Sequence, residues 1–206
     1  MTQWNVLYPV SLNLRGRRCV IVGERTDREA IEKYDALVEA GGDVVWLSQP
    51  HEVREADVRD AFFVISTPQD IELSKQMRVW ADRHRFLLCC IDQPEQGFVA
   101  MAAIVKSGPV RIAISTAGLA PRVGKVLKEA LQGALDSTFA RFIDCLATQR
   151  TRVKRAHPGA GESAVRRGAM IRAAEGFTTD VRVGYPQWFH ESLGYDHPTV
   201  VVEESP

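Results

Sequence analysis

The sequence predicts an α/β fold: a Rossmann-like, doubly wound parallel sheet, then a hairpin and a C-terminal helical domain. Short apolar runs alternate with helical patterns over about the first 90 residues, an order typical of parallel β-α-β units. A glycine–proline turn then joins two more apolar runs, and amphipathic helical patterns follow Pro121. We therefore expect a Rossmann-like domain over residues 1–115 and a dimerisation and helical region over residues 116–206.

The first strand is expected over residues 19–22, a short apolar run that enters a turn at Gly23. Thr26 and Glu29 have the spacing of a capping box, which predicts the start of a helix. Apolar residues then recur on one face as far as Ala40. The glycine pair that follows predicts the end of this helix.

Three more strands follow the same logic of apolar runs bounded by polar turns. They are expected over 44–47, 61–66 and 86–92, with helices over 52–58 and 70–84 between them. The runs 100–105 and 110–115 are separated by Ser107-Gly108-Pro109 and predict a hairpin. Residues 122–150 predict one long amphipathic helix, and 163–175 predict another.

Composition narrows the function classes. The 206 residues carry equal numbers of basic and acidic side chains and have a pI near 7.0, so overall charge gives no support to nucleic-acid or membrane binding. No apolar run approaches the roughly 20 residues of a membrane span, and the N-terminus lacks the pattern of a secretory leader. We therefore expect a cytoplasmic protein.

Cysteine and histidine residues show no metal-binding pattern. Cys19, Cys89, Cys90 and Cys145 form no Cys-x-x-Cys motif, and we interpret them as reduced core residues. The five histidines are scattered without ligand spacing. We accordingly predict no metal site.

Two polar segments follow apolar strands, and ligands of open α/β sheets bind at the carboxyl ends of strands. Asp92 closes the fourth strand, either as a catalytic carboxylate or as an ordinary turn residue. Ser115, Thr116 and Gly118 precede the helix that starts near Pro121. They are either a helix cap or an anion site at the start of that helix.

The residues after the first three strands are candidates for binding a dinucleotide, since this is where such folds hold one. The first turn has one glycine and several acidic residues, and no acid directly follows the second strand. The competing interpretation of the first turn is a helix start whose acidic residues complement the helix dipole. The candidate positions are Gly23, Glu24, Arg25, Ser48, Ser66 and Thr67.

Four segments resemble the siroheme synthase N-terminal module, the family of precorrin-2 dehydrogenase and sirohydrochlorin ferrochelatase. They are the run Tyr8–Gly23, the run Leu37–Gly41, Asp92-x-Pro94 with Phe98 and Ala103–Val105, and the run Gly108–Pro121. The last is the most specific, because strand, Ser-Thr, glycine and proline follow in the family's order. The likeness spans residues 7–150 and is weaker over 160–193.

The resemblance implies two late steps of sirohaem formation. NAD⁺ takes a hydride from precorrin-2 to give sirohydrochlorin, and many members then insert Fe²⁺. One aspartate serves both reactions in members that do both, and the matching position is Asp92. Ser115 and Thr116 match the substrate-facing turn. Since the tetrapyrrole carries many carboxylates, the basic side chains of Arg111, Arg122 and Lys125 are further candidates for binding it.

Three departures from the family pattern fall on the NAD side of the sheet. The cofactor turn lacks the Gly-x-Gly cluster, the segment between the second and third strands loses a strand, and the acid-rich stretch after the third strand reads Ser66-Thr-Pro-Gln-Asp70. Three functions stay open: a dehydrogenase that still uses NAD, a chelatase or tetrapyrrole-binding protein that has lost it, and a noncatalytic scaffold. We also expect a homodimer, because the apolar face of 122–150 is too long for the sheet domain to cover.

Overall fold

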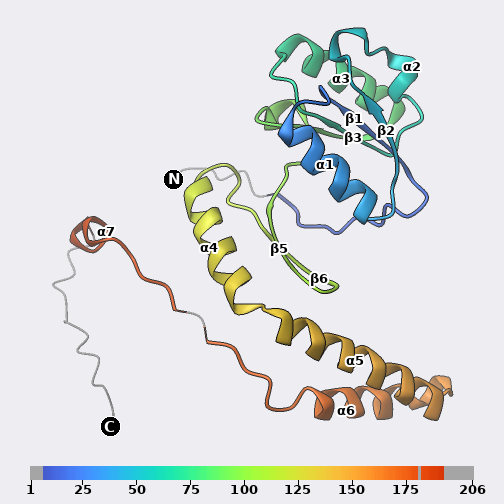
Figure 1. Cartoon of the computed structure of the whole chain (residues 1–206), viewed down its shortest axis with the longest axis vertical. Coiled ribbons are helices and arrows are strands. Elements are labelled where there is room, and N and C mark those ends of the chain that lie inside the picture. The colour runs from blue at the N-terminus through green and yellow to red at the C-terminus, as the bar shows by residue number, and fades with distance from the viewer. Residues whose placement is uncertain (1–6, 181, 193–206) are drawn as a thin grey trace. The chain divides into compact units, whose positions relative to one another are not determined.

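The computed structural model describes residues 7–180 and 182–192. By its internal contacts the chain divides into two compact units, Met1–Ile143 and Asp144–Pro206. The first unit holds the sheet, the hairpin and the helix that follows it (Figure 1). The expected boundary at residues 115 and 116 therefore lies inside this unit.

Four parallel strands form the sheet in the order β2-β1-β3-β4. Helices connect them on both faces, which confirms the predicted Rossmann-like fold. The chain passes from β1 outward to β2 and then crosses back to β3 on the other side of β1, so the order reverses between β1 and β3. The bounds are β1 Arg18–Val22, β2 Asp43–Leu47, β3 Phe63–Ser66 and β4 Leu87–Cys90.

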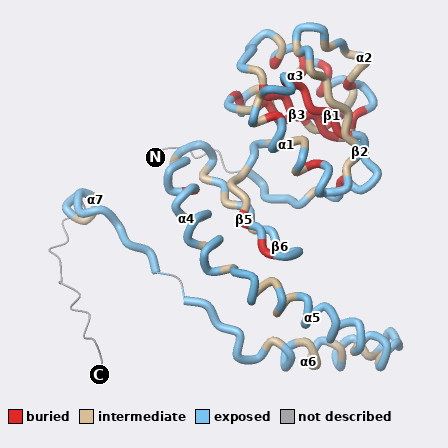
Figure 2. The backbone as a smooth tube through the Cα atoms, in the orientation of Figure 1, coloured by how far each residue is buried: buried red, intermediate tan, exposed pale blue. Residues whose placement is uncertain are grey.

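Successive side chains of a strand point to opposite faces of the sheet, so there are two hydrophobic cores, one on each face. In β1, Val20 and Val22 pack with α2 (Glu55–Val58) and α3 (Ile71–His84). Cys19 and Ile21 pack on the opposite face with α1 (Arg28–Glu39). Figure 2 shows the buried backbone concentrated in these strands and the helices against them.

The cysteine prediction is confirmed for three residues and wrong for one. Cys19, Cys89 and Cys90 are buried, whereas Cys145 is exposed on a later helix. None of the four forms a disulfide in the structure. Burial raises the pKa of the Cys89 thiol to about 12, so this thiol stays protonated near neutral pH and is an inert packing group.

The start of α1 differs from the predicted capping box. Asp27, rather than Thr26, is the cap residue, and its carboxylate accepts the backbone N–H of Glu29 at 2.9 Å. Asp70 caps α3 in the same way, accepting the N–H groups of Glu72 and Leu73. Aspartate is among the best cap residues, and its charge also suits the helix dipole.

The predicted hairpin is present, with β5 over Ala103–Ser107 and β6 over Val110–Ile114. Its turn contains Gly108 at φ +52°, where a residue without Cβ avoids strain. Lys106 and Arg111 face each other across the two strands, and both bind the carboxylate of Glu39 at the end of α1. The hydrogen bond from Lys106, with that from Arg111, lowers the pKa of Glu39.

The prediction of one long helix over 122–150 is wrong. Instead, α4 (Pro121–Ala134) ends at Leu135, and α5 (Ser137–Ala156) begins after Asp136. The carboxylate of Asp136 accepts the N–H groups of Thr138 and Phe139 at 2.9 Å. This cap satisfies the start of a new helix, which the apolar periodicity could not reveal.

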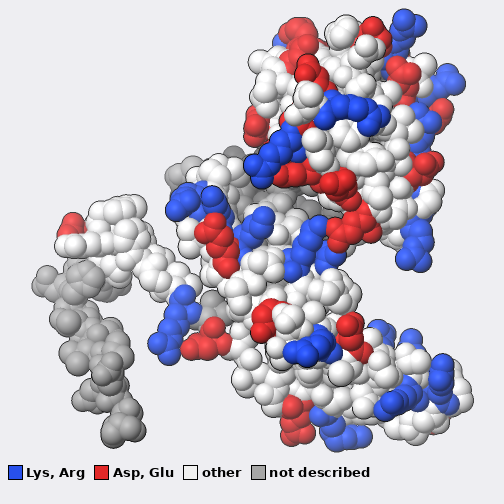
Figure 3. Space-filling view, in the orientation of Figure 1, with Lys and Arg blue, Asp and Glu red and all other residues white. Residues whose placement is uncertain are grey.

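The remaining elements are short. Helix α6 (Ser163–Ala173) follows α5, and Lys and Arg side chains gather over these two helices (Figure 3). Within the described ranges, none of the helices combines the length and apolar character that a membrane span requires. The other elements are α7 (Gln187–Ser192) and three 3₁₀ turns, Pro50–Glu52, Pro94–Gln96 and Ala160–Glu162.

Candidate active site at the carboxyl edge of the sheet

Asp92 lies just beyond the end of β4, at the carboxyl edge of the sheet, with its side chain exposed. Its backbone has φ +58°, a left-handed conformation that aspartate tolerates better than most residues. The amide of Gln69 donates a hydrogen bond to Asp92 Oδ2 at 3.2 Å. The carboxylate is therefore oriented yet open to solvent, as a proton acceptor must be.

The turn that carries Asp92 is fastened on both sides. Ile91 N–H bonds to the carbonyl of Ser66 at 2.9 Å, and Phe98 N–H bonds to the carbonyl of Leu88 at 2.7 Å. The guanidinium of Arg78 lies 3.8 Å from the centre of the Phe98 ring and donates to the carbonyl of Gly97. These contacts tie the loop to β3, β4 and α3, so Asp92 stands on a rigid base.

A second group forms where the strand order reverses. Gly23 follows β1, and a Cβ at this position would run into Thr67 Oγ1 and lie 3.0 Å from Ala30 Cβ. Thr67 follows β3, is buried, and donates its hydroxyl hydrogen bond to Asp27. The glycine thus permits a close approach between the first turn, the start of α1 and the end of β3.

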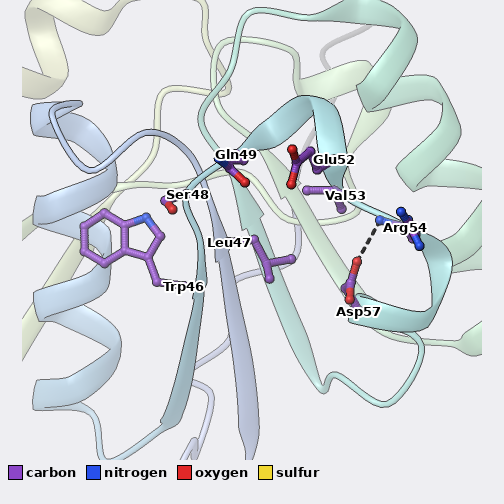
Figure 4. A pocket seen from close by; sticks show the side chains of 8 residues that line it. All are labelled: Trp46, Leu47, Ser48, Gln49, Glu52, Val53, Arg54 and Asp57. Atoms are coloured by element: carbon purple, nitrogen blue, oxygen red, sulfur yellow. Dashed lines mark hydrogen bonds between the residues drawn. The ribbon is translucent and has the colours of Figure 1, made fainter.

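Two shallow pockets open beside this group, at the carboxyl ends of the strands. The first, of about 290 Å³, lies at the switch point, which is the place between β1 and β3 where the strand order reverses. The second, of about 360 Å³, flanks the end of β2 and is called the β2-end pocket. In the second, Trp46 and Leu47 point to opposite sides of the strand, and Ser48 and Gln49 continue from its end (Figure 4). The first is lined by Glu24, Thr26, Asp27, Pro50, Thr67 and Pro68.

A dinucleotide fits the placement of these pockets. In doubly wound sheets the phosphates lie at the first helix start and the adenosine half lies beyond the second strand. Here the β2-end pocket offers hydroxyl, amide and guanidinium groups from Ser48, Gln49 and Arg54. The start of α1 is less suited to bind the phosphates, because the Asp27 carboxylate already occupies it.

The other expected cofactor positions differ in their access. Glu24 and Arg25 are exposed in the first turn, and Ser48 is half-buried at the end of β2. Ser66 is buried, and its hydroxyl has no hydrogen-bond partner within the described part of the chain. Ser66 therefore lies inside the sheet, where a ligand has no access to its side chain.

The Ser115–Pro121 turn is a separate group. Ser115 Oγ accepts the N–H of Ala117, and the Thr116 methyl lies 3.5 Å from where a Cβ on Gly124 would be. Neither side chain caps α4, whose cap residue is Ala120, so the capping interpretation is wrong. The backbone turns through Ala117 and Gly118 at positive φ, and the first N–H groups of α4 have no side-chain cap.

The three basic candidates lie in different surroundings. Arg111 is held by Glu39, Arg122 is exposed in the first turn of α4, and Lys125 lies 3.8 Å from Glu129 on the same helix. Arg122 is therefore the cation nearest in sequence to the uncapped helix start. No hydrogen bond or ion pair joins Asp92 to this turn among the residues that the structure describes.

Sequence reasoning missed two side chains of this edge and, for a third, the acidic residue Asp27, did not identify the contact that it makes. Gln69 orients Asp92, Asp27 occupies the start of α1, and Trp46 donates its indole N–H to the carbonyl of Gly23 at 2.8 Å. Asp27 had a signal, since aspartate directly before a helical pattern is a cap motif. For the other two, the partner is distant in sequence. Across the described ranges, no group of acidic, cysteine or histidine side chains is arranged to hold a metal ion.

Comparison with known proteins agrees with this architecture. Residues 10–103 match a protein family described as "Putative NAD(P)-binding". The chain is 27% identical over 170 residues to siroheme synthase of Hahella chejuensis, covering 73% of this chain and 36% of that protein. It is 28% identical over 175 residues to siroheme synthase of Gluconacetobacter diazotrophicus, covering 75% and 37%. The chain thus spans about a third of the length of these relatives.

A solved structure shares the fold. The structure titled "SirC, precorrin-2 dehydrogenase" superposes with a TM-score of 0.62 at 18% identity, covering 82% of this chain and 90% of that one. At this identity the match establishes the fold. Together with the sequence relatives, it confirms the resemblance noted in the sequence.

Proposed function

We propose that this chain, a relative of the siroheme synthases with a Rossmann-like sheet, acts in sirohaem formation as an NAD(P)-dependent precorrin-2 dehydrogenase. The observation that carries the proposal is the exposed Asp92 carboxylate, fixed by Gln69 at the carboxyl edge of the sheet. Its relatives and its fold neighbour bear the names of this pathway.

Oxidation of precorrin-2 to sirohydrochlorin removes a hydride and a proton. Asp92 is the proposed proton acceptor, because its carboxylate is exposed and its turn is fastened to the sheet. A dinucleotide held at the carboxyl edge of the sheet would supply the hydride acceptor. Ser48 and Gln49 would hold its adenosine half, and Thr67 lines the neighbouring pocket where the strand order reverses.

The tetrapyrrole carboxylates are proposed to bind at the uncapped start of α4. Backbone N–H groups there attract anions, and the Ser115 and Thr116 turn precedes them. Arg122 and Lys125 add positive charge on the same helix. Arg111 would have to leave Glu39 before it could bind substrate.

The test is anaerobic oxidation of precorrin-2 with NAD⁺ or NADP⁺, followed by the absorbance of sirohydrochlorin. Wild-type protein should accelerate the reaction, and Asp92→Asn should reduce it strongly while leaving the fold intact. An Asp92→Asn protein as active as wild type would make Asp92 a turn residue.

A second function is favoured by a specific observation. Because the Asp27 carboxylate occupies the start of α1, a chelatase or tetrapyrrole-binding protein without a dinucleotide is the alternative. Insertion of Fe²⁺, a substrate here, releases two pyrrole protons, which Asp92 would accept one at a time and pass to solvent. Accelerated sirohaem formation from sirohydrochlorin and Fe²⁺, with no dinucleotide binding, would support this alternative.

We also propose a homodimer. Leu119, Val123 and Val126 are 64%, 53% and 50% exposed near the start of α4, and apolar side chains in such a cluster favour burial against another surface. Sedimentation equilibrium should give about twice the chain mass of 22.9 kDa. Val126→Asp should shift the mass towards the monomer, whereas Val79→Asp, at an exposed position on α3, should not.

A further inference from the structure

We propose that the dinucleotide bound at this site carries a 2′-phosphate, so that it is NADP(H) rather than NAD(H), and that Arg25 selects it. The proposal rests on the dinucleotide-binding part of the proposed function. It concerns the end of β2, where the ribose of the adenosine half lies in doubly wound sheets.

The end of β2 lacks the group that selects NAD. Sites selective for NAD place an aspartate or glutamate near this strand end, which accepts a hydrogen bond from the ribose 2′-hydroxyl. Here Ser48 and Gln49 follow the strand, and both side chains can donate hydrogen bonds. The two residues directly after the strand therefore lack the carboxylate that would accept the 2′-hydroxyl of NAD.

Arg25 is held beside the same strand end by stacking. Its guanidinium carbon lies 4.7 Å from the ring centre of Trp46, the fourth residue of β2. Trp46 is itself fixed by two interactions. Its indole N–H bonds to the carbonyl of Gly23 at 2.8 Å, and its ring centre lies 4.8 Å from that of Tyr34. The position of the guanidinium thus follows from the first turn and α1 together.

Stacking leaves the donors of Arg25 available. Within residues 7–180 and 182–192, the structure gives Arg25 neither a hydrogen bond nor an ion pair. The nearby acids have other partners: Glu24 accepts the hydroxyl of Thr26 at 3.4 Å, and Asp27 binds Glu29 and Thr67. A planar guanidinium with free N–H groups is suited to bind a phosphate with two hydrogen bonds.

Two acids, Glu52 and Asp57, line the β2-end pocket. Glu52 lies 3.8 Å from His51, and Asp57 accepts the backbone N–H of Arg54 at 2.8 Å. The guanidinium of Arg54 lines the same pocket, on the side away from Trp46 (Figure 4). A phosphate on the 2′-oxygen beside Trp46 would meet the guanidinium of Arg25, whereas the hydroxyl of NAD(H) would gain little from it.

The experiment measures nucleotide binding without turnover. Wild-type protein is titrated calorimetrically with 2′,5′-ADP and with 5′-AMP, and by nucleotide fluorescence with NADPH and NADH. We expect the 2′-phosphorylated member of each pair to bind roughly tenfold to a hundredfold more tightly. Raising the salt concentration should reduce this preference, because it screens exposed charges.

Two variants test the role of Arg25. Arg25→Ala should abolish the preference while leaving the affinity for NADH within about twofold of wild type, since only the contact with the 2′-phosphate is lost. Arg28→Ala is the matched control, because this exposed arginine lies three positions on and pairs with Glu32 at 2.9 Å. It should behave as wild type. Circular dichroism melting checks that both variants fold.

Each other result overturns the proposal. Equal or tighter binding of NADH by wild type contradicts the choice of nucleotide, and a preference that survives Arg25→Ala contradicts the role of Arg25. In both cases the dehydrogenase proposal stands. If no nucleotide binds at all, both the preference and the dinucleotide-dependent function fail, and the chelatase alternative is favoured.

Discussion

Two aspartates at the same edge of the sheet differ in what surrounds them. Asp27 binds the Glu29 N–H and the Thr67 hydroxyl, so its carboxylate is engaged by the fold itself. Asp92 is exposed, and within the described residues its side chain has one partner, the amide of Gln69 at 3.2 Å. A carboxylate that the fold already satisfies serves structure, while one left open at a strained turn is available for chemistry.

Asp92→Asn is expected to have the largest effect. Asparagine keeps the shape and tolerates positive φ, but it cannot accept the substrate proton. We expect kcat for precorrin-2 oxidation to fall by about 100- to 10,000-fold, measured under anaerobic conditions at saturating dinucleotide. The melting temperature should change little. A large loss of stability would instead place Asp92 with the structural aspartates.

Gly23→Ala tests how tightly the Asp27 side of the edge is packed. The added Cβ would meet Thr67 Oγ1 and Ala30 Cβ, and we expect a loss of about 1–3 kcal/mol in the free energy of unfolding. Gly133→Ala is the control, because a Cβ there meets nothing within 4 Å and the position is helical. It should stabilise by about 0.5–1 kcal/mol. Equal effects in urea denaturation would contradict the close approach.

Asp27→Asn separates the capping role of Asp27 from its charge. Asparagine caps helices about as well as aspartate, so stability should change little. Removing a negative charge near the phosphates should tighten NADPH binding by about fivefold, as expected for roughly 1 kcal/mol of repulsion. Asp70→Asn changes the equivalent cap of α3 and should leave binding unchanged. Fluorescence titration distinguishes the outcomes, and weaker binding by Asp27→Asn would show that the carboxylate helps to hold the cofactor.

The smallest effect is expected at Glu39. Its hydrogen bonds to Lys106 and Arg111 lower its pKa below the usual 4.5, so the unfolded chain binds the proton more readily. The stabilisation is present above about pH 4.5 and is lost as the pH falls through the lower pKa of the folded state. Melting curves from pH 7 to pH 3 should therefore show an acid-dependent loss that is smaller in Glu39→Gln, while the lowered pKa values of Glu55 and Asp136 contribute equally in both proteins. Glu32→Gln, which removes only a pair within α1, should retain the wild-type pH profile.

The fold was largely predictable because its signals are local. Apolar runs gave the four strands to within a few residues, and the turn at Gly108 gave the hairpin. The helix after Pro121 was predicted as too long because both halves are amphipathic. The break depends on Asp136, whose side chain satisfies the start of the second half.

The site was predictable only in part. Position after a strand identified Asp92 and Gly23, since the carboxyl edge follows from parallel topology. It could not reveal that Gln69 reaches Asp92, or that Trp46 supports Arg25, because these contacts join residues far apart in sequence. Periodicity also gave no sign that Arg111 pairs with Glu39.

The ion pairs of Glu39 with Lys106 and Arg111 depend on the register of the hairpin. Lys106 and Arg111 are direct cross-strand partners, so one carboxylate can bridge them only in this register. A slip of one residue would turn one of the two cations to the opposite face. Glu39 therefore stabilises this register of the hairpin, because in a slipped hairpin one of the two strand cations would lose the carboxylate that they share.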